Sequence, residues 1–300
     1  MYHYNKRGHT AKMNFKNSEL VLLGTGGGPS IWESRSQPSS ALVINNDIYI
    51  IDTGDGVASQ MARAKLDPKA IKAIFVTHNH SDHVADFGTL LLRAWQTGHN
   101  GTIQCFGPPP LEKIANSYIE YMRWDIELRM QYEGRPDFRS IMDVRDIYEN
   151  SHFFTDDNIS VDCIAVPHGE AYPSYAYRFQ IGTKSVVFSG DTSKSEALIT
   201  FSKDVDILVH EILNTDGVEA IIERTYPGNE SFKRHIIDGH TPMREVGEVA
   251  SASGAKTLVL NHFVPTGSPI LDKPEIWEEG VGASYGGNII VGSDLLRIPI

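Results

Sequence analysis

Six consecutive residues include four side chains that can bind a metal ion. They read His-Asn-His-Ser-Asp-His from position 78 and follow a short apolar run. Side chains alternate between the two faces of an extended segment, so His78 and His80 can point toward the same ion. If the chain then begins a helix, Asp82 and His83 lie in its first turn and can face a second ion. Imidazole and carboxylate suit zinc, manganese or iron, and the lack of cysteine argues against a closed structural zinc site.

Three further candidate ligands follow other apolar runs. His168, Asp191 and His262 each come directly after a strand-like segment. A single histidine is more often structural than metal-binding. Three candidates in the same position after a strand, beside a motif that needs partners, favour one shared site over a polar loop that happens to be rich in histidine.

The composition indicates a globular protein without general affinity for polyanions. The chain has 300 residues, 41% of them hydrophobic, with a formal charge of −11 and a pI near 5.5. It can bury a large core, and long nucleic acids are poor candidates for a surface-wide partner. No apolar run reaches the ~18 residues of a membrane-spanning helix, so no membrane association is expected.

The cysteines and the N-terminal segment indicate the cellular compartment in which the protein is expected. Cys105 and Cys163 stand in strand-like apolar segments, where we expect buried free thiols. Such thiols fit a reducing compartment and a cytoplasmic location. Residues 1–17 are polar and lack the apolar core of a signal peptide, so we expect a flexible tail there. A leader removed from the natural protein stays an open alternative.

Residues 18–300 are expected to form a single domain. Strands are predicted at 20–23, 41–44, 48–51, 71–77, 159–166, 175–181, 184–188, 205–209 and 257–261, with a last hairpin near 288–298. Helices are predicted at 57–65, 83–97, 194–201 and 242–253. Hairpins mixed with crossovers indicate an α/β (α+β) protein with sheets inside and helices outside.

A glycine-rich turn at positions 24–28 could suggest dinucleotide binding. Its sixth position is Pro29, so the G-x-G-x-x-G spacing fails, and no helical pattern follows directly. We interpret the segment as a tight turn near the active site.

Several motifs together resemble the metallo-β-lactamase superfamily, and within it the ribonuclease Z group and its arylsulfatase-like relatives. The resemblance covers about residues 18 to 298. Its motifs are Leu23–Gly26, Ile51–Gly54, His78–His83, Pro167–Gly169, Ser189–Thr192, Val209–Glu211, Gly239–Thr241 and Asn261–His262. It implies a four-layer αβ/βα sandwich with a dinuclear metal site at the strand ends.

The resemblance also implies roles for single residues. Two divalent ions are expected, zinc first, with Mn²⁺ or Fe²⁺ as alternatives. The first ion would be held by His78, His80 and His168, the second by Asp82, His83 and His262, with Asp191 bridging both. Asp52 would orient a ligand or the bridging water, although an ordinary turn aspartate is the alternative.

The expected chemistry is ester hydrolysis. Two cations about 3.5–4 Å apart can share a water and lower its pKa, giving a bridging hydroxide at neutral pH. Asp82 belongs to this catalytic centre as well as to the ligands. By resemblance, Glu211 and His240 would protonate the leaving group, since a carboxylate raises the pKa of a neighbouring imidazole. His210 and His235 are alternatives for His240.

Two departures from the ribonuclease Z pattern bear on the substrate. The strand ending at Phe179 runs at once into Gly182 and the next strand, which leaves no room for the arm that grips transfer RNA in that family. No tRNA partner is therefore expected. Residues 99–155 look enlarged and contain helical spacing, which fits either a helix packed on the core or a lid insertion over the metals.

Our sequence hypothesis is a dinuclear metal-dependent hydrolase of a small-molecule ester, with a phosphodiester as first choice. The same centre could serve an arylsulfatase-like enzyme or a carboxylic ester or lactone hydrolase. A non-catalytic binding protein that keeps the fold is a second alternative, disfavoured because all seven ligands are present. A redox di-iron enzyme would need a flavin partner domain, for which no room remains. A homodimer is expected by analogy alone.

Overall fold

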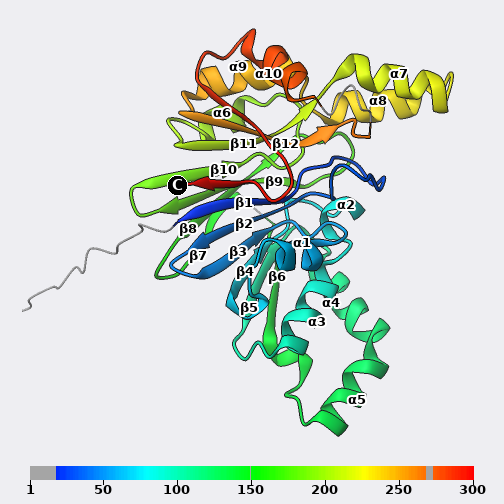
Figure 1. Cartoon of the computed structure of the whole chain (residues 1–300), viewed down its shortest axis with the longest axis vertical. Coiled ribbons are helices and arrows are strands. Elements are labelled where there is room, and N and C mark those ends of the chain that lie inside the picture. Colours follow the sequence, from blue (N-terminus) through cyan, green and yellow to red (C-terminus); the bar gives the residue numbers. More distant parts are fainter. Residues whose placement is uncertain (1–17, 149, 268–272) are drawn as a thin grey trace, which may run out of the picture.

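Two β-sheets pack face to face and carry helices on their outer faces, which gives four layers (Figure 1). The computed structural model describes residues 18–148, 150–267 and 273–300. The tail predicted for 1–17 lies outside the described residues. The α/β sandwich predicted from the sequence is confirmed.

The first sheet has seven strands in the order β14-β1-β2-β3-β4-β5-β6. They are β1 (Glu19–Gly24), β2 (Ser39–Ile44), β3 (Asp47–Ile51), β4 (Ile71–Phe75), β5 (Ile103–Gly107), β6 (Met142–Asp146) and β14 (Arg297–Pro299). The strands predicted at 41–44 and 48–51 are β2 and β3, which pair antiparallel as a hairpin. Asn45 and Asn46 both have positive φ in its turn, the conformation of a type I′ turn.

The second sheet also has seven strands, in the order β13-β12-β11-β10-β9-β8-β7. They are β7 (Ser151–Thr155), β8 (Ser160–Val166), β9 (Ser174–Ile181), β10 (Lys184–Phe188), β11 (Ile207–Leu213), β12 (Thr257–Val264) and β13 (Asn288–Val291). Strands β10 to β13 run parallel, so their carboxyl ends share one edge of the sheet. Strands β9 and β10 join through the short turn Gly182–Thr183, with Ile181 paired to Lys184.

The hairpin predicted near 288–298 is wrong. Strand β13 pairs in parallel with β12, whereas β14 pairs antiparallel with β1 of the other sheet. The connection crosses between the sheets, and the Asp294 carboxylate on it accepts hydrogen bonds from Thr25 N and Ser36 N, 3.0 and 2.7 Å long. Two short β-rich runs in sequence do not reveal that each completes a different sheet edge.

Helices cover both outer faces. Those on the first sheet are α1 (Val57–Arg63), α3 (Phe87–Thr97), α4 (Leu111–Tyr121) and α5 (Arg123–Glu133), and those on the second are α6 (Glu196–Phe201), α9 (Met243–Ser253) and α10 (Pro274–Gly282). Short turns form α2 (Ser81–Val84) and the 3₁₀ segments Pro68–Ala70 and Phe138–Ile141. A helical pair, α7 (Thr215–Thr225) and α8 (Glu230–Gly239), projects from one side (Figure 1).

The single helix predicted at 83–97 is two helices, α2 and α3. The helix is interrupted at Asp86, whose backbone N–H donates to Thr53 O over 3.0 Å. The Asp86 carboxylate accepts from Gly56 N over 2.8 Å. These tertiary bonds hold the loop before α1 against the metal motif, and hydrophobic periodicity alone cannot show them.

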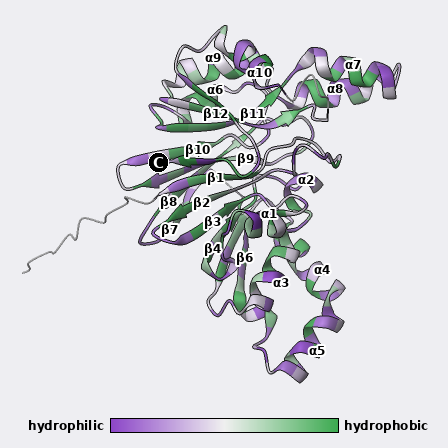
Figure 2. Cartoon of the chain, in the orientation of Figure 1, coloured by the Kyte–Doolittle hydropathy of each residue, from purple (hydrophilic) through white to green (hydrophobic). Residues whose placement is uncertain are grey.

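Aromatic side chains fill the space between the sheets. Phe75 lies 5.1 Å from Phe179 and 5.8 Å from Tyr177, measured between ring centroids. Both sheets are largely hydrophobic, whereas the outer helices alternate hydrophobic and hydrophilic residues (Figure 2). Each fully buried aromatic contributes about 1.5–3 kcal/mol by leaving water. Cys105 and Cys163 are buried thiols that form no disulfide, as predicted.

No helix within the three described ranges combines the length and the hydrophobicity needed to cross a lipid bilayer.

Candidate metal centre

The predicted ligands meet at one edge of the sandwich. His78 follows β4, His168 follows β8, Asp191 follows β10, and His262 lies near the end of β12. Gly190 permits the sharp turn before Asp191, since it has φ = 59° and an added Cβ would lie 2.5 Å from the Tyr175 carbonyl oxygen. The strand ends thus bring together side chains that are far apart in sequence.

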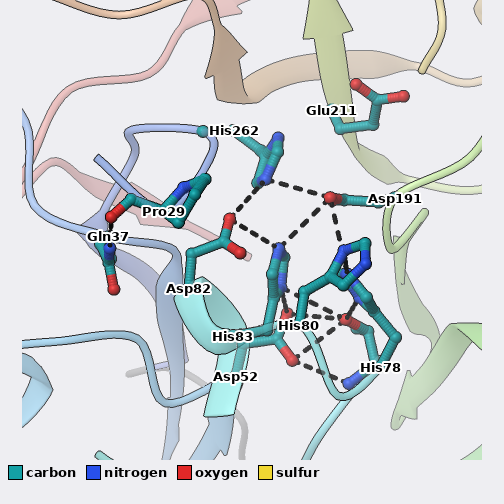
Figure 3. Close-up of polar contacts among 12 residues, drawn as sticks. Pro29, Gln37, Asp52, His78, His80, Asp82, His83, Asp191, Glu211 and His262 are labelled. Carbon is teal, nitrogen blue, oxygen red and sulfur yellow. Dashed lines mark hydrogen bonds and ion pairs between the residues drawn. The ribbon is translucent and has the colours of Figure 1, made fainter. Parts of the chain in front are cut away.

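Seven side chains form one cluster, in which His80 is half-buried and the others are buried. All of them except His168 are labelled in Figure 3. His78, His80 and His168 offer ligand atoms within 4.8 Å of one another, as do Asp82, His83 and His262. Both groups lie beside Asp191 (Figure 3). The structure therefore brings together every residue that the sequence analysis assigned to the two ions.

Asp191 lies at the centre of the cluster. Its Oδ2 atom is 3.1 Å from Nε2 of His262 and 3.3 Å from Nε2 of His83. The same oxygen is 3.7 Å from Nε2 of His78 and 3.8 Å from Nε2 of His168. One carboxylate oxygen thus faces four imidazoles that come from both triads, the first made of His78, His80 and His168 and the second of Asp82, His83 and His262.

Three imidazoles are fixed through their Nδ1 atoms, which leaves Nε2 facing the cluster. Nδ1 of His83 lies 2.9 Å from Asp52 Oδ2, and Nδ1 of His168 lies 2.6 Å from the Gly239 carbonyl oxygen. His78 Nδ1 lies 3.1 Å from the Thr77 hydroxyl. Such contacts set the tautomer and orientation of metal-binding histidines.

The donor set fits divalent cations. His80 Nδ1 lies 3.0 Å from His78 Nε2 and 3.2 Å from His168 Nε2, so three ring nitrogens converge. His83 Nε2 is buried and has no hydrogen-bond partner. Convergent nitrogen lone pairs and buried carboxylates repel one another unless positive charge lies between them, and Zn²⁺ accepts both donor types.

The pKa values of the cluster residues are consistent with positive charge between the converging donors. Burial lowers the pKa of His168 to about 4 and that of His78 well below its ordinary value, so both imidazoles are neutral at pH 7. Burial alone would raise the pKa of Asp82, but His83 and His262 outweigh it and lower it to about 2. Burial would also lower the pKa of His83, yet Asp191 and its neighbouring carboxylates raise it well above the usual range. The site favours positive charge at its centre.

Two residues of the site have left-handed backbone. Asp52 has φ = 60° and His262 has φ = 46°, a conformation uncommon for residues with a side chain. Such strain costs of the order of 1–3 kcal/mol and concentrates at functional sites. At both positions the surrounding structure holds the side chain in the cluster.

Glu211 and His240 form a pair beside the cluster. Glu211 Oε2 lies 3.2 Å from His240 Nδ1, and Oε1 accepts from Thr241 N over 2.7 Å. Burial alone would lower the pKa of His240, but the Glu211 carboxylate outweighs it and raises it to about 9. The alternative His210 turns its Nδ1 to the Glu211 carbonyl oxygen, 2.6 Å away. Among the three candidates, His240 contacts the Glu211 carboxylate.

A cavity of about 500 Å³ opens beside the cluster. Cluster residues line one end, and the glycine-rich turn lines another part at Gly27. Gly27 N donates to Phe263 O over 3.0 Å, next to His262. The segment therefore lies beside the cluster, as interpreted, but it is not a tight turn: Gly26 forms an isolated parallel bridge with Phe263, and the chain bends only from Gly28.

The sequence analysis missed the helices that form the cavity wall. Helices α7 and α8 and the residue that follows α7 line the cavity with Val218, Ile221, Ile222, Tyr226, Phe232, His235 and Ile236. Their spacing was a usable signal, because 218, 221 and 222 and again 232, 235 and 236 follow helical periodicity. Asn214 and Asn229 accept from Gly217 N and Phe232 N as N-caps.

Residues 99–155 lie elsewhere. Leu111, Ala115 and Ile119 of α4 are buried against the first sheet, as the core-packing interpretation predicts. None of them is among the described residues that line the cavity. A lid at 99–155 stays a prediction.

Fold and cluster together define a metal-dependent hydrolase with the sandwich of the metallo-β-lactamases. The model of the β-lactamase superfamily domain matches residues 48–263, and the chain belongs to this family.

The similar proteins support the assignment of the chain to the ribonuclease Z-like group. Ribonuclease Z of Mycobacterium bovis is 27% identical over 285 residues, which cover 94% of this chain and 98% of the relative. The short form of human tRNase Z superposes with a TM-score of 0.65 at 20% identity, covering 94% of this chain and 99% of that one. A metallo-β-lactamase fold protein of Bacillus subtilis, YhfI, superposes with a TM-score of 0.68 at 19% identity, covering 94% and 98%.

Proposed function

We propose that the chain hydrolyses a small phosphodiester with two divalent cations. The observation that carries this proposal is the position of Asp191 Oδ2 within 3.8 Å of imidazoles from both triads. His78, His80 and His168 would hold one cation, and Asp82, His83 and His262 the other, with Asp191 shared between them.

When bound, the two cations supply a water of lowered pKa and neutralise the charge that builds on the ester oxygens. The chain's own residues set the geometry. Asp52, Thr77 and the Gly239 carbonyl group hold the imidazoles in the binding tautomer. Asp82 lines the cavity and therefore faces the substrate as well as the cation.

His240 would protonate the leaving oxygen. It lines the cavity, and its Nδ1 faces the Glu211 carboxylate, which leaves Nε2 free for a substrate. Glu211 is itself fixed by Thr241 N. The carboxylate stabilises the imidazolium, which can then donate its proton.

Zinc is the proposed metal. The seven proposed ligands offer imidazole nitrogens and carboxylate oxygens, which Zn²⁺ accepts with distances near 2.0–2.2 Å. Mn²⁺ and Fe²⁺ accept the same donors and are the alternatives.

A small ester fits this chain better than transfer RNA. The turn at Gly182–Thr183 joins β9 and β10 without an inserted arm. The charge of −11 repels a polyanion, and protein–nucleic acid affinity depends strongly on cationic contacts. The curated relatives are named ribonuclease Z, and we propose a smaller substrate than RNA for this chain.

Turnover of an ester panel by the purified, zinc-loaded protein tests the function. The panel contains bis(4-nitrophenyl) phosphate, 4-nitrophenyl sulfate, 4-nitrophenyl acetate, a lactone and a transfer RNA precursor. We expect the phosphodiester to give the highest kcat/KM and Asp191→Ala to abolish it. Preference for the sulfate or a carboxylic ester would instead support the arylsulfatase-like or esterase alternative. Cleavage of the RNA precursor as the best substrate would overturn the proposal.

A further inference from the structure

The cavity beside the metal cluster has two chemically different ends. The polar end consists of cluster residues and His240. A second part of the wall is apolar and is formed by Trp32, Val218, Ile221, Ile222, Phe232 and Ile236. His235 of α8 also lines the cavity, and its ring centroid lies 6.2 Å from that of His80 at the polar end. An ester placed at the polar end would direct one substituent along this wall.

The apolar wall has no lysine or arginine side chain, among the described residues, that could pair with a chain of phosphates. No lysine or arginine is among the described residues that line the cavity. Lys233, on α8, pairs with Glu219 over 2.7 Å. Arg234 lines a neighbouring hollow, which shares Phe232 and His235 with the cavity, and is not among the residues that line the cavity itself. A nucleotide with several phosphates would find its charges unpaired along the wall, which is costly. The lining thus disfavours polyphosphates and nucleic acids.

The apolar lining continues to the mouth of the cavity. Tyr226 and Phe232 are 54% and 37% exposed, and their rings meet edge to face with centroids 5.2 Å apart. Trp32, 38% exposed, lines the same cavity. These aromatics face water when the cavity is open, so an apolar ligand gains free energy by covering them.

We propose that the substrate carries a compact apolar substituent, of aryl or branched-alkyl size, which lies against α7 and α8 while the ester group lies at the metal cluster. This inference rests on the proposed function for the reacting group only. A volume of about 500 Å³ accommodates such a molecule and lies within the usual range for small-ligand sites.

A comparison of two phosphonates tests the apolar wall without turnover. Calorimetric titration of the purified, zinc-loaded protein with phenylphosphonate and with methylphosphonate measures both affinities. The anionic group is common to the two probes, so their affinity ratio isolates the contribution of the phenyl ring. We expect phenylphosphonate to bind at least about tenfold more tightly, because the free energy gained by burying several apolar carbons exceeds the free energy that corresponds to a tenfold ratio of affinities.

Two variants locate the effect. Phe232→Ala and Ile221→Ala should each lower the phenyl-to-methyl ratio about threefold or more, and Phe232→Leu should restore most of it. Tyr132→Ala removes an exposed aromatic of α5 outside the cavity and should leave the ratio unchanged. Melting curves check that each variant is folded.

The outcomes separate this inference from the proposed function. A high ratio in a protein that hydrolyses no ester would support the apolar subsite and reject the catalytic proposal. Phosphodiester turnover with a ratio near one would do the opposite. A ratio near one, absence of phenylphosphonate binding, or tighter binding of adenosine diphosphate or a short RNA than of phenylphosphonate would overturn the inference.

Discussion

The Asp52 carboxylate connects Thr77 and His83 at the base of the cluster. It accepts from Thr77 N over 2.7 Å, contacts the Thr77 hydroxyl, and faces His83 Nδ1 over 2.9 Å. The family resemblance of the Ile51–Gly54 motif indicated Asp52. It could not show the contact between His168 and the Gly239 carbonyl oxygen, because nothing local to either residue reveals a partner 71 positions away.

Asp52→Asn should weaken metal binding while preserving the fold. Asparagine tolerates the left-handed backbone at this position and has nearly the same size. The loss of a carboxylate behind a ligating histidine costs about 10–100-fold in metal affinity. Competition with a fluorescent zinc chelator measures this change. Asp67→Asn, at an exposed 3₁₀ segment, is the matched control, and equal affinity in both variants would contradict the role of Asp52.

His240→Ala should affect substrates according to their leaving groups. An alkoxide needs a proton to leave, whereas nitrophenolate does not, so we expect a loss of about 10²–10⁴ in kcat for an alkyl phosphodiester. The loss for bis(4-nitrophenyl) phosphate should be much smaller. Steady-state kinetics with both substrates measure the difference. His152→Ala, on the exposed strand β7, is the control, and equal losses in His240→Ala would contradict the proton-donor role.

At the scale of elements, strand ends position the proposed ligands, and the pair α7–α8 forms part of the cavity wall. Most strands were predictable because apolar runs and turn residues mark them locally. The split between α2 and α3 was not, since tertiary bonds of Asp86 cause it. The two strands of the last predicted hairpin belong to different sheets, a distinction that depends on long-range pairing.

Asp206 should stabilise the second sheet above acidic pH. Burial alone would raise its pKa, but hydrogen bonds from Lys256 and Ser185 N, with the Lys184 charge, outweigh it and lower it. A folded pKa below the unfolded value of about 3.9 adds stability above that pH, and the gain is lost as pH falls through the folded pKa.

Urea unfolding of Asp206→Asn measures this contribution. We expect the variant to be less stable than the parent by about 1 kcal/mol at pH 7, and the difference to shrink below about pH 4. The exposed Asp157→Asn serves as the control. A difference that is constant with pH would show that the Asp206 charge does not stabilise the sheet.

At the scale of the whole molecule, two sheets from the two halves of the chain close around the site. The first sheet supplies the motif from His78 to His83, and the second supplies His168, Asp191 and His262. The motifs that carry the family resemblance were sufficient to predict the sandwich and the residues that meet in the cluster. They did not reveal the cavity wall, because an amphipathic helix over a substrate and one over a core have the same periodicity.

Zinc content per chain tests the central claim most directly. The purified protein is equilibrated with zinc, passed through a desalting column, and analysed by plasma mass spectrometry beside Asp191→Ala. Because Asp191 is proposed to bind both ions, we expect about two zinc ions per chain in the parent and one or fewer in the variant. A parent without bound transition metal, or a variant that keeps two ions, would contradict the account.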